Sequence, residues 1–281
     1  MTEPHEALRI TEVSPTYWRA TFTNGPLNVF DSAIMIALQG LLDRMEASDE
    51  LRVVVFDSDV EDFFLAHFDM SGASTEVARA QGPTGLPTGL DITTRLTTSP
   101  VISIAKIRGR ARGIGSEFAL ACDLRFASKE RAVLGQPEVG AGVIPGGGAI
   151  ERLSSLVGRG RALEIIVGSD DFDAATAERY GYVNRAVPDA ELDEYVDTLA
   201  RRIASFDRRP IAAAKTLVNR TTLPEVGHLV ESQTKFGETL TWPETTARVR
   251  ELFGRGLQQP GDLETRFGYH LGVPSEEAER A

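Results

Sequence analysis

The stretch of this sequence that decides the fold is Gly109-Arg110-Ala111-Arg112-Gly113-Ile114-Gly115-Ser116-Glu117-Phe118-Ala119-Leu120-Ala121-Cys122-Asp123. It follows an apolar strand expected to end near Ile107, and it opens a helix predicted to begin near Gly115. A Gly-x-Gly turn that enters a helix leaves backbone N–H groups unpaired, and the helix dipole adds partial positive charge there. The turn is therefore a candidate site for an oxyanion or a phosphate. It is not a P-loop, because Gly-x4-Gly-Lys-Ser/Thr is absent.

Glu117 falls in the first turn of this predicted helix, beside the unpaired N–H groups. It could serve as a catalytic carboxylate, or it could simply complement the helix dipole, as acidic residues at helix starts commonly do. Taken alone, the position favours the second interpretation. Arg110 and Arg112 in the same stretch fit equally well as phosphate contacts or as solvated surface charges.

Two other places also put polar or glycine residues directly after apolar segments, where ligands bind in α/β sheets. The first is Phe63-Phe64-Leu65-Ala66-His67-Phe68-Asp69-Met70, after a strand ending at Phe56, and the second is Leu134-Gly135-Gln136-Pro137-Glu138, continued by Ile144-Pro145-Gly146-Gly147-Gly148. A partly desolvated Glu138 would have a raised pKa suited to general-acid catalysis, although alone it is better explained as a solvated loop acid. His67 lies among apolar neighbours and is more simply a packed side chain than a proton donor.

Composition limits the classes of function. The 281 residues carry 30 Lys and Arg against 41 Asp and Glu, a net charge of −11 that disfavours nucleic acid and anionic membranes as partners. No apolar run is long enough to span a bilayer. Met1 to Glu6 show no signal peptide, and the single cysteine, Cys122, rules out an internal disulfide, so a cytoplasmic protein is expected. The four histidines are scattered, so no metal site is predicted.

The alternation of strands and helices predicts an α/β core with a mixed or parallel sheet. Strands are expected over residues 17–23, 52–56 and 101–105, and Asp31 is a plausible N-cap for the first helix. Residues 71–88 are interpreted as a surface loop. Beyond Ala149 the chain is predicted to be mostly helical, including residues 192–206 and 210–220, and the tail beyond Pro260 to be frayed.

Together, the three segments resemble the crotonase (enoyl-CoA hydratase/isomerase) superfamily. Residues 66–70 are similar to its Ala-Gly-x-Asp-(Leu/Met/Ile) signature, and residues 109–123 to Gly-x-Ala-x-Gly-Gly-Gly-x-Glu-Leu-Ala-x-x-Cys-Asp. Residues 135–138 and 144–148 are similar to Gly-Gln-Pro-Glu followed by Ile-Pro-Gly-x-Gly-Gly, and the likeness extends over roughly residues 10–255. The joint match is far more specific than any single glycine motif, so it outweighs the separate alternatives above.

The resemblance implies a crotonase-like spiral of ββα units with a helical C-terminal region. Residues 1–200 would form the spiral core with the CoA-thioester site, and residues 201–281 a helical oligomerisation region. A homotrimer or hexamer is implied. So is an acyl-CoA thioester as the bound partner, with CoA part of the substrate and no further cofactor.

The resemblance also implies roles for individual residues. The backbone N–H groups of Phe68 and Ile114 would form the oxyanion hole for the thioester carbonyl, and Glu117 and Glu138 would be catalytic. Ala66, His67, Asp69, Gly113 and Gly115 would contact substrate or CoA. Two glutamates favour hydration of a 2-enoyl-CoA, with Glu138 delivering the proton to the α-carbon.

Alternatives on the same scaffold are an enoyl-CoA isomerase, an acyl-CoA thioester hydrolase and a non-catalytic CoA-binding or scaffold protein.

The sequence departs from the family pattern at several positions. His67 and Ile114 replace glycines, Arg112 adds a charge beside the second motif, and the spacing from Glu117 to Glu138 is one residue longer than usual. A β-branched side chain at 114 would crowd the acyl pocket. We therefore predict a specialised substrate or a reduced hydratase activity.

Overall fold

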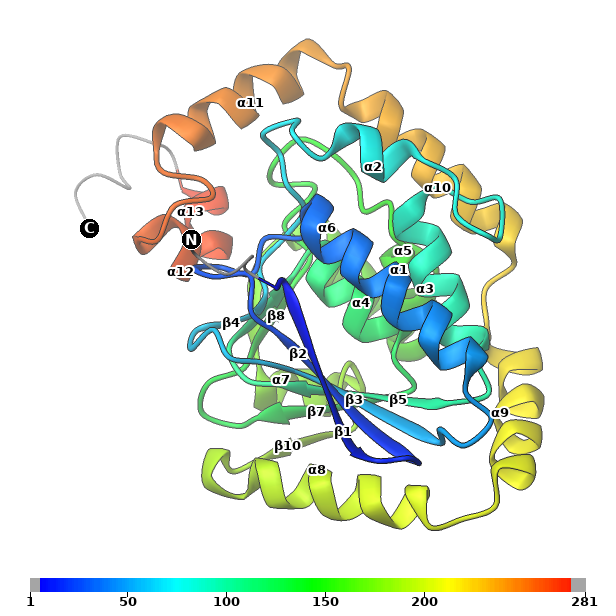
Figure 1. Ribbon diagram of the computed structural model, residues 1–281. Helices are drawn as coiled ribbons and strands as arrows, with labels where there is room; N and C mark the ends of the chain where they lie inside the picture. Colours follow the sequence, from blue (N-terminus) through cyan, green and yellow to red (C-terminus); the bar gives the residue numbers. More distant parts are fainter. Residues whose placement is uncertain (1–5, 274–281) are drawn as a thin grey trace, which may run out of the picture.

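The computed structural model describes residues 6–273, and its larger sheet has six strands in the order β1-β2-β3-β5-β7-β10 (Figure 1). β1 pairs antiparallel with β2, and every other pairing in this sheet is parallel. The strands are β1 Leu8–Ser14, β2 Tyr17–Phe22, β3 Val53–Ser58, β5 Ile102–Ile107, β7 Leu124–Ser128 and β10 Arg185–Val187. The strands predicted over residues 17–23, 52–56 and 101–105 are confirmed as β2, β3 and β5.

A second, smaller sheet has the order β4-β6-β8-β9, with β9 antiparallel to β8 and the other pairs parallel. Its strands are β4 Phe63–Leu65, β6 Arg110–Arg112, β8 Val133–Gly135 and β9 Asp171–Asp173. Successive strands alternate between the sheets: β3, β5 and β7 lie in the larger sheet, whereas β4, β6 and β8 lie in the smaller one. A helix follows each pair, so the chain forms the predicted spiral of ββα units.

The helices of the spiral are α1 Ser32–Ala47, α2 Thr75–Arg79, α3 Thr88–Thr98, α4 Ile114–Ala121, α5 Ala149–Val157, α6 Arg159–Gly168 and α7 Ala174–Tyr180. Asp31 is the N-cap of α1, as predicted, and its Oδ1 accepts from the Ile34 N–H at 3.0 Å. α1, α3, α4 and α5 pack against one face of the larger sheet in a single apolar core (Figure 1). α8 Asp189–Ala204 covers the other face through Leu192 and Val196.

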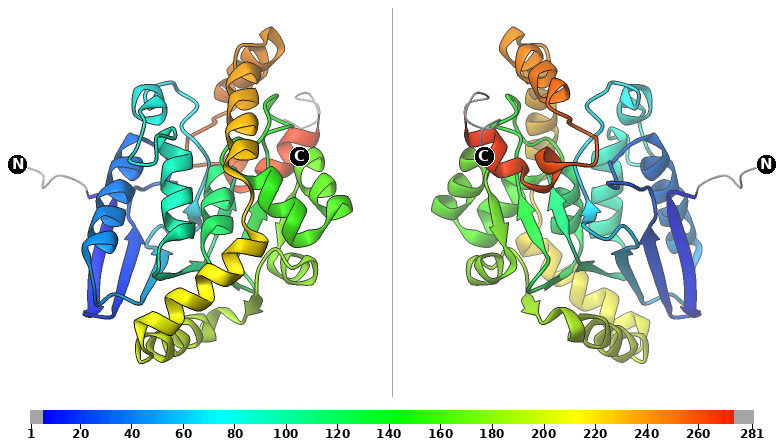
Figure 2. Two further views of the ribbon diagram at one scale, coloured as in Figure 1. Left: turned by 90° about the vertical axis from the view of Figure 1, so that its right-hand side faces the viewer. Right: turned by 90° about the vertical axis from the view of Figure 1, so that its left-hand side faces the viewer.

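The last third of the described chain is helical, as expected. Its helices are α9 Arg208–Thr222, α10 Val226–Thr239, α11 Pro243–Gly254, α12 Asp262–Thr265 and α13 Phe267–Gly272. Figure 2 shows α10 and α11 as a long arm that extends past the sheets. Lys215 is the one buried residue of α9, and it anchors that helix by donating to the Val101 carbonyl at 2.8 Å. The division into a core of residues 1–200 and an oligomerisation region of residues 201–281 stays a prediction.

Two predictions about irregular segments are wrong. Residues 71–88 are not only a loop, because they contain α2 and end where α3 begins. The chain beyond Pro260 is not frayed up to Val273, because α12 and α13 are packed there through Leu263 and Phe267. The rest of that predicted tail lies outside the described residues.

Candidate active site

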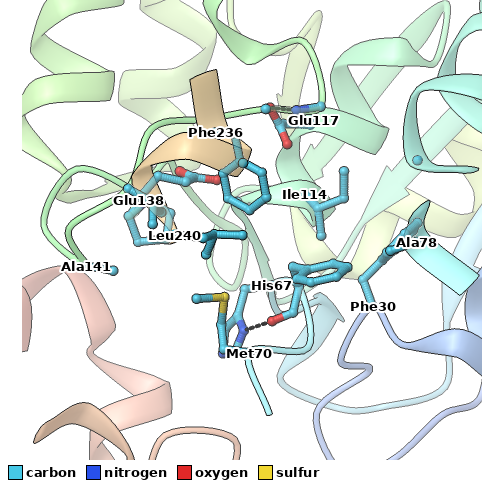
Figure 3. Close-up of a pocket in the computed structure, with 18 of the residues that line it drawn as sticks. Phe30, His67, Met70, Ala78, Ile114, Glu117, Glu138, Ala141, Phe236 and Leu240 are labelled. Carbon is cyan, nitrogen blue, oxygen red and sulfur yellow. Dashed lines mark hydrogen bonds between the residues drawn. The ribbon is translucent and has the colours of Figure 1, made fainter. Parts of the chain in front are cut away.

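A cavity of about 310 Å³ lies where the spiral core meets the C-terminal helices (Figure 3). Six of the predicted site residues line it, namely His67, Phe68, Gly113, Ile114, Glu117 and Glu138. Ala66, Asp69 and Gly115 do not line it. Much of the remaining wall is apolar and comes from positions that no sequence motif marked, such as Phe30, Met35, Phe236, Leu240 and Leu252.

The two predicted oxyanion donors are unpaired. The Phe30 N–H donates to the His67 carbonyl at 2.8 Å, and the Asp69 N–H donates to the Phe30 carbonyl at 3.2 Å. The Phe68 N–H, which lies between them in the chain, takes no part in this bridge. Ile114 is the first residue of α4, where a helix leaves its N–H groups without internal partners. Across residues 6–273 neither the Phe68 nor the Ile114 N–H has a protein acceptor.

Glycines let these two segments approach each other. A Cβ on Gly115 would lie 2.2 Å from the Leu65 carbonyl oxygen, so only glycine lets the start of α4 pack against β4. Gly113 has φ +50°, which glycine tolerates best, and a Cβ there would lie 2.9 Å from Oε1 of Glu138. Gly113 and Gly115 therefore shape the site through their lack of side chains.

Glu117 is buried on α4, yet its carboxylate reaches the start of α5. Oε1 accepts from the Gly147 N–H at 2.8 Å and from the Ala149 N–H at 3.0 Å. Burial raises the pKa of Glu117 to about 7, although these two hydrogen bonds act in the opposite direction. The side chain therefore does not complement the dipole of its own helix. Oε2 has no hydrogen-bond partner among the described residues, which leaves it available to a ligand.

Glu138 lies in the loop that follows β8, directly after Pro137, and its Oε2 is buried without a partner. Burial, together with the nearby charge of Glu117, raises the pKa of Glu138 well above its usual range. The solvated loop acid that the sequence alone favoured is thus ruled out. Two buried carboxyl groups, both with a raised pKa, therefore line the same cavity.

Arg152, to which the sequence analysis gave no role, supports Glu117. Arg152 is buried on α5 and donates to the Gly147 carbonyl at 3.1 Å, which fixes the loop whose N–H groups hold the carboxylate. The pairing needs no substrate, so Arg152 is a structural support of the site.

His67 is buried and bonded through both ring nitrogens. Nδ1 lies 2.9 Å from the Phe68 carbonyl oxygen, and Nε2 lies 3.0 Å from Oε1 of Glu264 on α12. Burial alone would lower the pKa of His67, but the Glu264 carboxylate and the Phe68 carbonyl outweigh that effect and raise it. Sequence analysis did not identify Glu264, because nothing in the local pattern of α12 indicates that its partner is His67, almost two hundred residues away.

Both interpretations offered for Arg112 are wrong. Its side chain is buried in a bidentate pair with Asp171, with Nε to Oδ1 and Nη2 to Oδ2 each at 2.6 Å, and Nη1 donates to the Glu264 carbonyl at 2.6 Å. Arg110 donates from Nε to the Thr265 carbonyl at 2.9 Å. These two arginines therefore hold α12 against the smaller sheet.

Ala66 and Asp69 were predicted to contact CoA, and both are buried. The Asp69 carboxylate accepts from the Ser71 N–H at 2.9 Å and from the Ser74 hydroxyl at 2.7 Å, which shapes the loop after Phe68. Burial would raise the pKa of Asp69, but hydrogen bonds from Ser71, Ser74 and Gln258 lower it to about 2. A contact between either residue and CoA stays a prediction.

Arg79 on α2 is exposed at the cavity wall. It has no hydrogen-bond or ion-pair partner within residues 6–273, whereas Arg112 and Arg152 are committed to internal bonds. Across the same residues, no three His, Cys, Asp or Glu side chains gather closely enough to hold a metal ion. None of the helices there combines the length and apolar character that crossing a bilayer requires.

A ββα spiral that brings two carboxyl groups and free backbone N–H donors into one cavity is the arrangement of a crotonase-fold enzyme. A profile of the enoyl-CoA hydratase/isomerase family matches residues 18–241, and the chain belongs to that family.

Individual relatives agree with this assignment. The chain is 33% identical over 194 residues to a short-chain-enoyl-CoA hydratase of Clostridium acetobutylicum, covering 69% of this chain and 74% of the relative. A crystal structure from Streptomyces avermitilis, provisionally assigned as an enoyl-CoA hydratase, is 43% identical with a TM-score of 0.91, over 98% of this chain and 99% of the other. An enoyl-CoA hydratase structure from Mycobacterium avium subsp. paratuberculosis, 22% identical over 88% of this chain and 99% of the other, shares the fold with a TM-score of 0.77.

Proposed function

We propose that this protein adds water to a 2-enoyl-CoA thioester. The observation that carries the proposal is that Glu117 and Glu138 line the same cavity as Phe68 and Ile114, whose N–H groups are unpaired. Two such donors suit a thioester oxygen, which gains negative charge when a nucleophile adds at the β-carbon. Loss of one comparable donor in an enzyme raises the barrier by about 3 to 4 kcal/mol.

The raised pKa values of Glu117 and Glu138 suggest separate roles for the two acids. Glu117, with a pKa of about 7, accepts a proton from water as the new C–O bond forms at the β-carbon. Glu138, whose pKa burial and the charge of Glu117 raise well above its usual range, gives its proton to the α-carbon as the enolate collapses. The product has gained one water. Proton exchange with solvent then restores both acids.

The lining of the cavity favours a neutral hydrocarbon acyl group. Apart from the two acids, His67 and Arg79, the side chains that face it are largely apolar. The unpaired guanidinium of Arg79 is suited to a phosphate of CoA at the cavity mouth. CoA enters here only as part of the substrate, and the proposed chemistry uses no metal or redox cofactor.

The test is a panel of 2-enoyl-CoA thioesters from crotonyl-CoA upward, with mass detection of products. We expect a gain of one water, at a lower turnover of crotonyl-CoA than efficient housekeeping hydratases reach. Glu117→Gln and Glu138→Gln should each lower kcat by about 100-fold or more, whereas Glu178→Gln, an exposed position on α7, should leave it unchanged.

A shifted alkene would instead identify an isomerase, and free CoA a thioester hydrolase. Binding of CoA thioesters without any turnover would identify a scaffold protein. Each of these results would contradict hydration.

The family resemblance and the C-terminal helices together suggest a homotrimer or hexamer in the cytoplasm. Large apolar side chains are exposed along α9, α10 and α11 and the turn between the last two, namely Leu217, Val218, Val226, Trp242 and Phe253. Burying such a surface against another copy is favourable. Light scattering on the purified protein measures the number of chains, and a monomer would contradict the proposal.

The net charge of −11 argues against nucleic acid or anionic membranes as partners.

A further inference from the structure

The C-terminal segment, residues 257–272, is bonded to the loop that carries Phe68 and also forms part of the cavity wall. Leu257 and Phe267 line the cavity. Gln258 accepts from the Met70 N–H through Oε1 at 2.9 Å and donates through Nε2 to Asp69 Oδ1 at 3.1 Å. With the contact between His67 and Glu264, the residues on both sides of Phe68 are thus bonded to this one segment.

An imidazolium, with a proton on each ring nitrogen, satisfies both contacts of His67. The Phe68 carbonyl can only accept a hydrogen bond, so Nδ1 must carry a proton. Glu264 is fully buried and already accepts from the Gln258 N–H at 2.7 Å, and a buried carboxylate needs a charged or donating partner. The geometry is therefore that of an imidazolium donating from Nε2 to a carboxylate, at 3.0 Å to Oε1 and 3.2 Å to Oε2.

We propose that His67 is a positioning residue, which, when paired with Glu264, fixes the Phe68 peptide and couples the C-terminal segment to the predicted oxyanion donor. The family pattern has glycine at this position, so the coupling belongs to this chain's own departure from the pattern. The role rests on the proposed thioester site, but its central feature, the charged pair, exists without any reaction.

The pair should respond to pH in one direction. The titratable or charged groups that face His67 are Glu264 on α12, Arg112 on β6 and, across Gly113, Glu138. Because the pKa of His67 is raised in the folded protein, the imidazolium is present below pH about 6.5 and persists above it, until the pH passes the raised value. Once neutral, His67 has one N–H for two acceptors, so one of its contacts is lost.

The first test uses no substrate. NMR titration of ¹⁵N-labelled histidine should give His67 a pKa above the ordinary value of about 6.5, with its signal assigned by loss in His67→Gln. In Glu264→Gln the amide oxygen can still accept from Nε2, but the charge is gone, so the pKa of His67 should fall. In both variants, hydrogen exchange should accelerate together in peptides covering residues 65–74 and 255–272. His228→Gln, at an exposed position on α10, is the matched control and should change none of these.

The second test measures thioester turnover against pH. His67→Gln and Glu264→Gln should each lower kcat/KM by about 10- to 100-fold, mainly through kcat, since misplacing a catalytic donor has effects of this size. The double variant should lose no more than the worse single variant, because both remove the same coupling. The alkaline limb of the wild-type profile should move to lower pH in Glu264→Gln.

The two tests separate this proposal from hydration. A His67 pKa at or below the ordinary value of about 6.5, or no change in that pKa in Glu264→Gln, would overturn the positioning role whatever the reaction is. The positioning role would also be overturned if the loss in kcat/KM of the double variant equalled the product of the losses of the two single variants. A charged, coupled His67 in a protein that adds no water would support the coupling and contradict only the proposed reaction.

Discussion

Replacing Glu117 with glutamine should stabilise the protein in alkaline solution while lowering its kcat by about 100-fold or more. Oε1 of a glutamine can still accept from the Gly147 and Ala149 N–H groups, so the start of α5 keeps its partners. What the substitution removes is the ionisation of a buried group. The pKa of Glu117 rises from 4.5 to about 7 on folding because burial disfavours its charged form.

The magnitude follows from this difference in proton affinity. A raised carboxyl pKa means that the folded protein binds the proton more tightly, so its stability falls as pH rises from about 4.5 to about 7 and then levels off. Each factor of ten in proton affinity is worth about 1.4 kcal/mol, so the ionised Glu117 costs about 3 kcal/mol above pH 7. Glu117→Gln should therefore be more stable than the wild type by about this amount at pH 8, and by almost nothing at pH 4.5.

Urea denaturation at a fixed protein concentration, repeated between pH 4.5 and pH 8, measures the difference. Glu178→Gln on the surface of α7 is the matched control and should follow the wild type throughout. A stability difference that is the same at every pH, or a Glu117→Gln protein that is less stable at pH 8, would refute the reasoning.

Other predictions rest on close contacts around the same cavity. A Cβ on Gly147 would lie 2.4 Å from Oε2 of Glu117, so Gly147→Ala should lower kcat by about 100-fold. A Cβ on Gly160 would meet nothing within 4 Å, so Gly160→Ala should leave kcat unchanged. Steady-state kinetics measures both variants. Arg79→Ala should raise KM for CoA thioesters about fivefold with kcat unchanged, and the difference should shrink as salt is added. Ile114→Ala should cost about 2 to 4 kcal/mol of unfolding free energy and improve kcat/KM for acyl groups branched near the β-carbon relative to straight ones.

Local sequence signals predicted the spiral core well. The helix predicted to begin near Gly115 is α4, which begins at Ile114, because glycines that permit a close approach and an apolar helix face act within a few residues of one another. The short strand β6 in the same stretch was not predicted. Asp31 was placed as an N-cap for the same reason, since its partner lies three residues further on. The two acids and both predicted donors also meet in one cavity, which the joint motif match led us to expect.

The failures involve partners that lie far apart along the chain. Arg112 was interpreted as a phosphate contact or a surface charge, but it is buried between Asp171 on β9 and the carbonyl of Glu264. Nothing near residue 112 indicates either partner. The short helix α2 spans five residues and buries none of them, so it has no apolar periodicity to detect. α12 and α13 are likewise short, and α12 is held by Arg110, Arg112 and His67 of the distant core.

The contribution of the C-terminal segment to the cavity wall affects how a substrate preference can be inferred from one relative to another. The family match ends at residue 241, whereas Val249, Leu252, Leu257 and Phe267 in the wall of the cavity all lie beyond it. Two proteins can thus agree in every signature residue and still enclose differently shaped spaces for the acyl group. Sorting such proteins by preferred thioester therefore requires an alignment of the segment that corresponds to residues 242–273, which the family signatures do not cover.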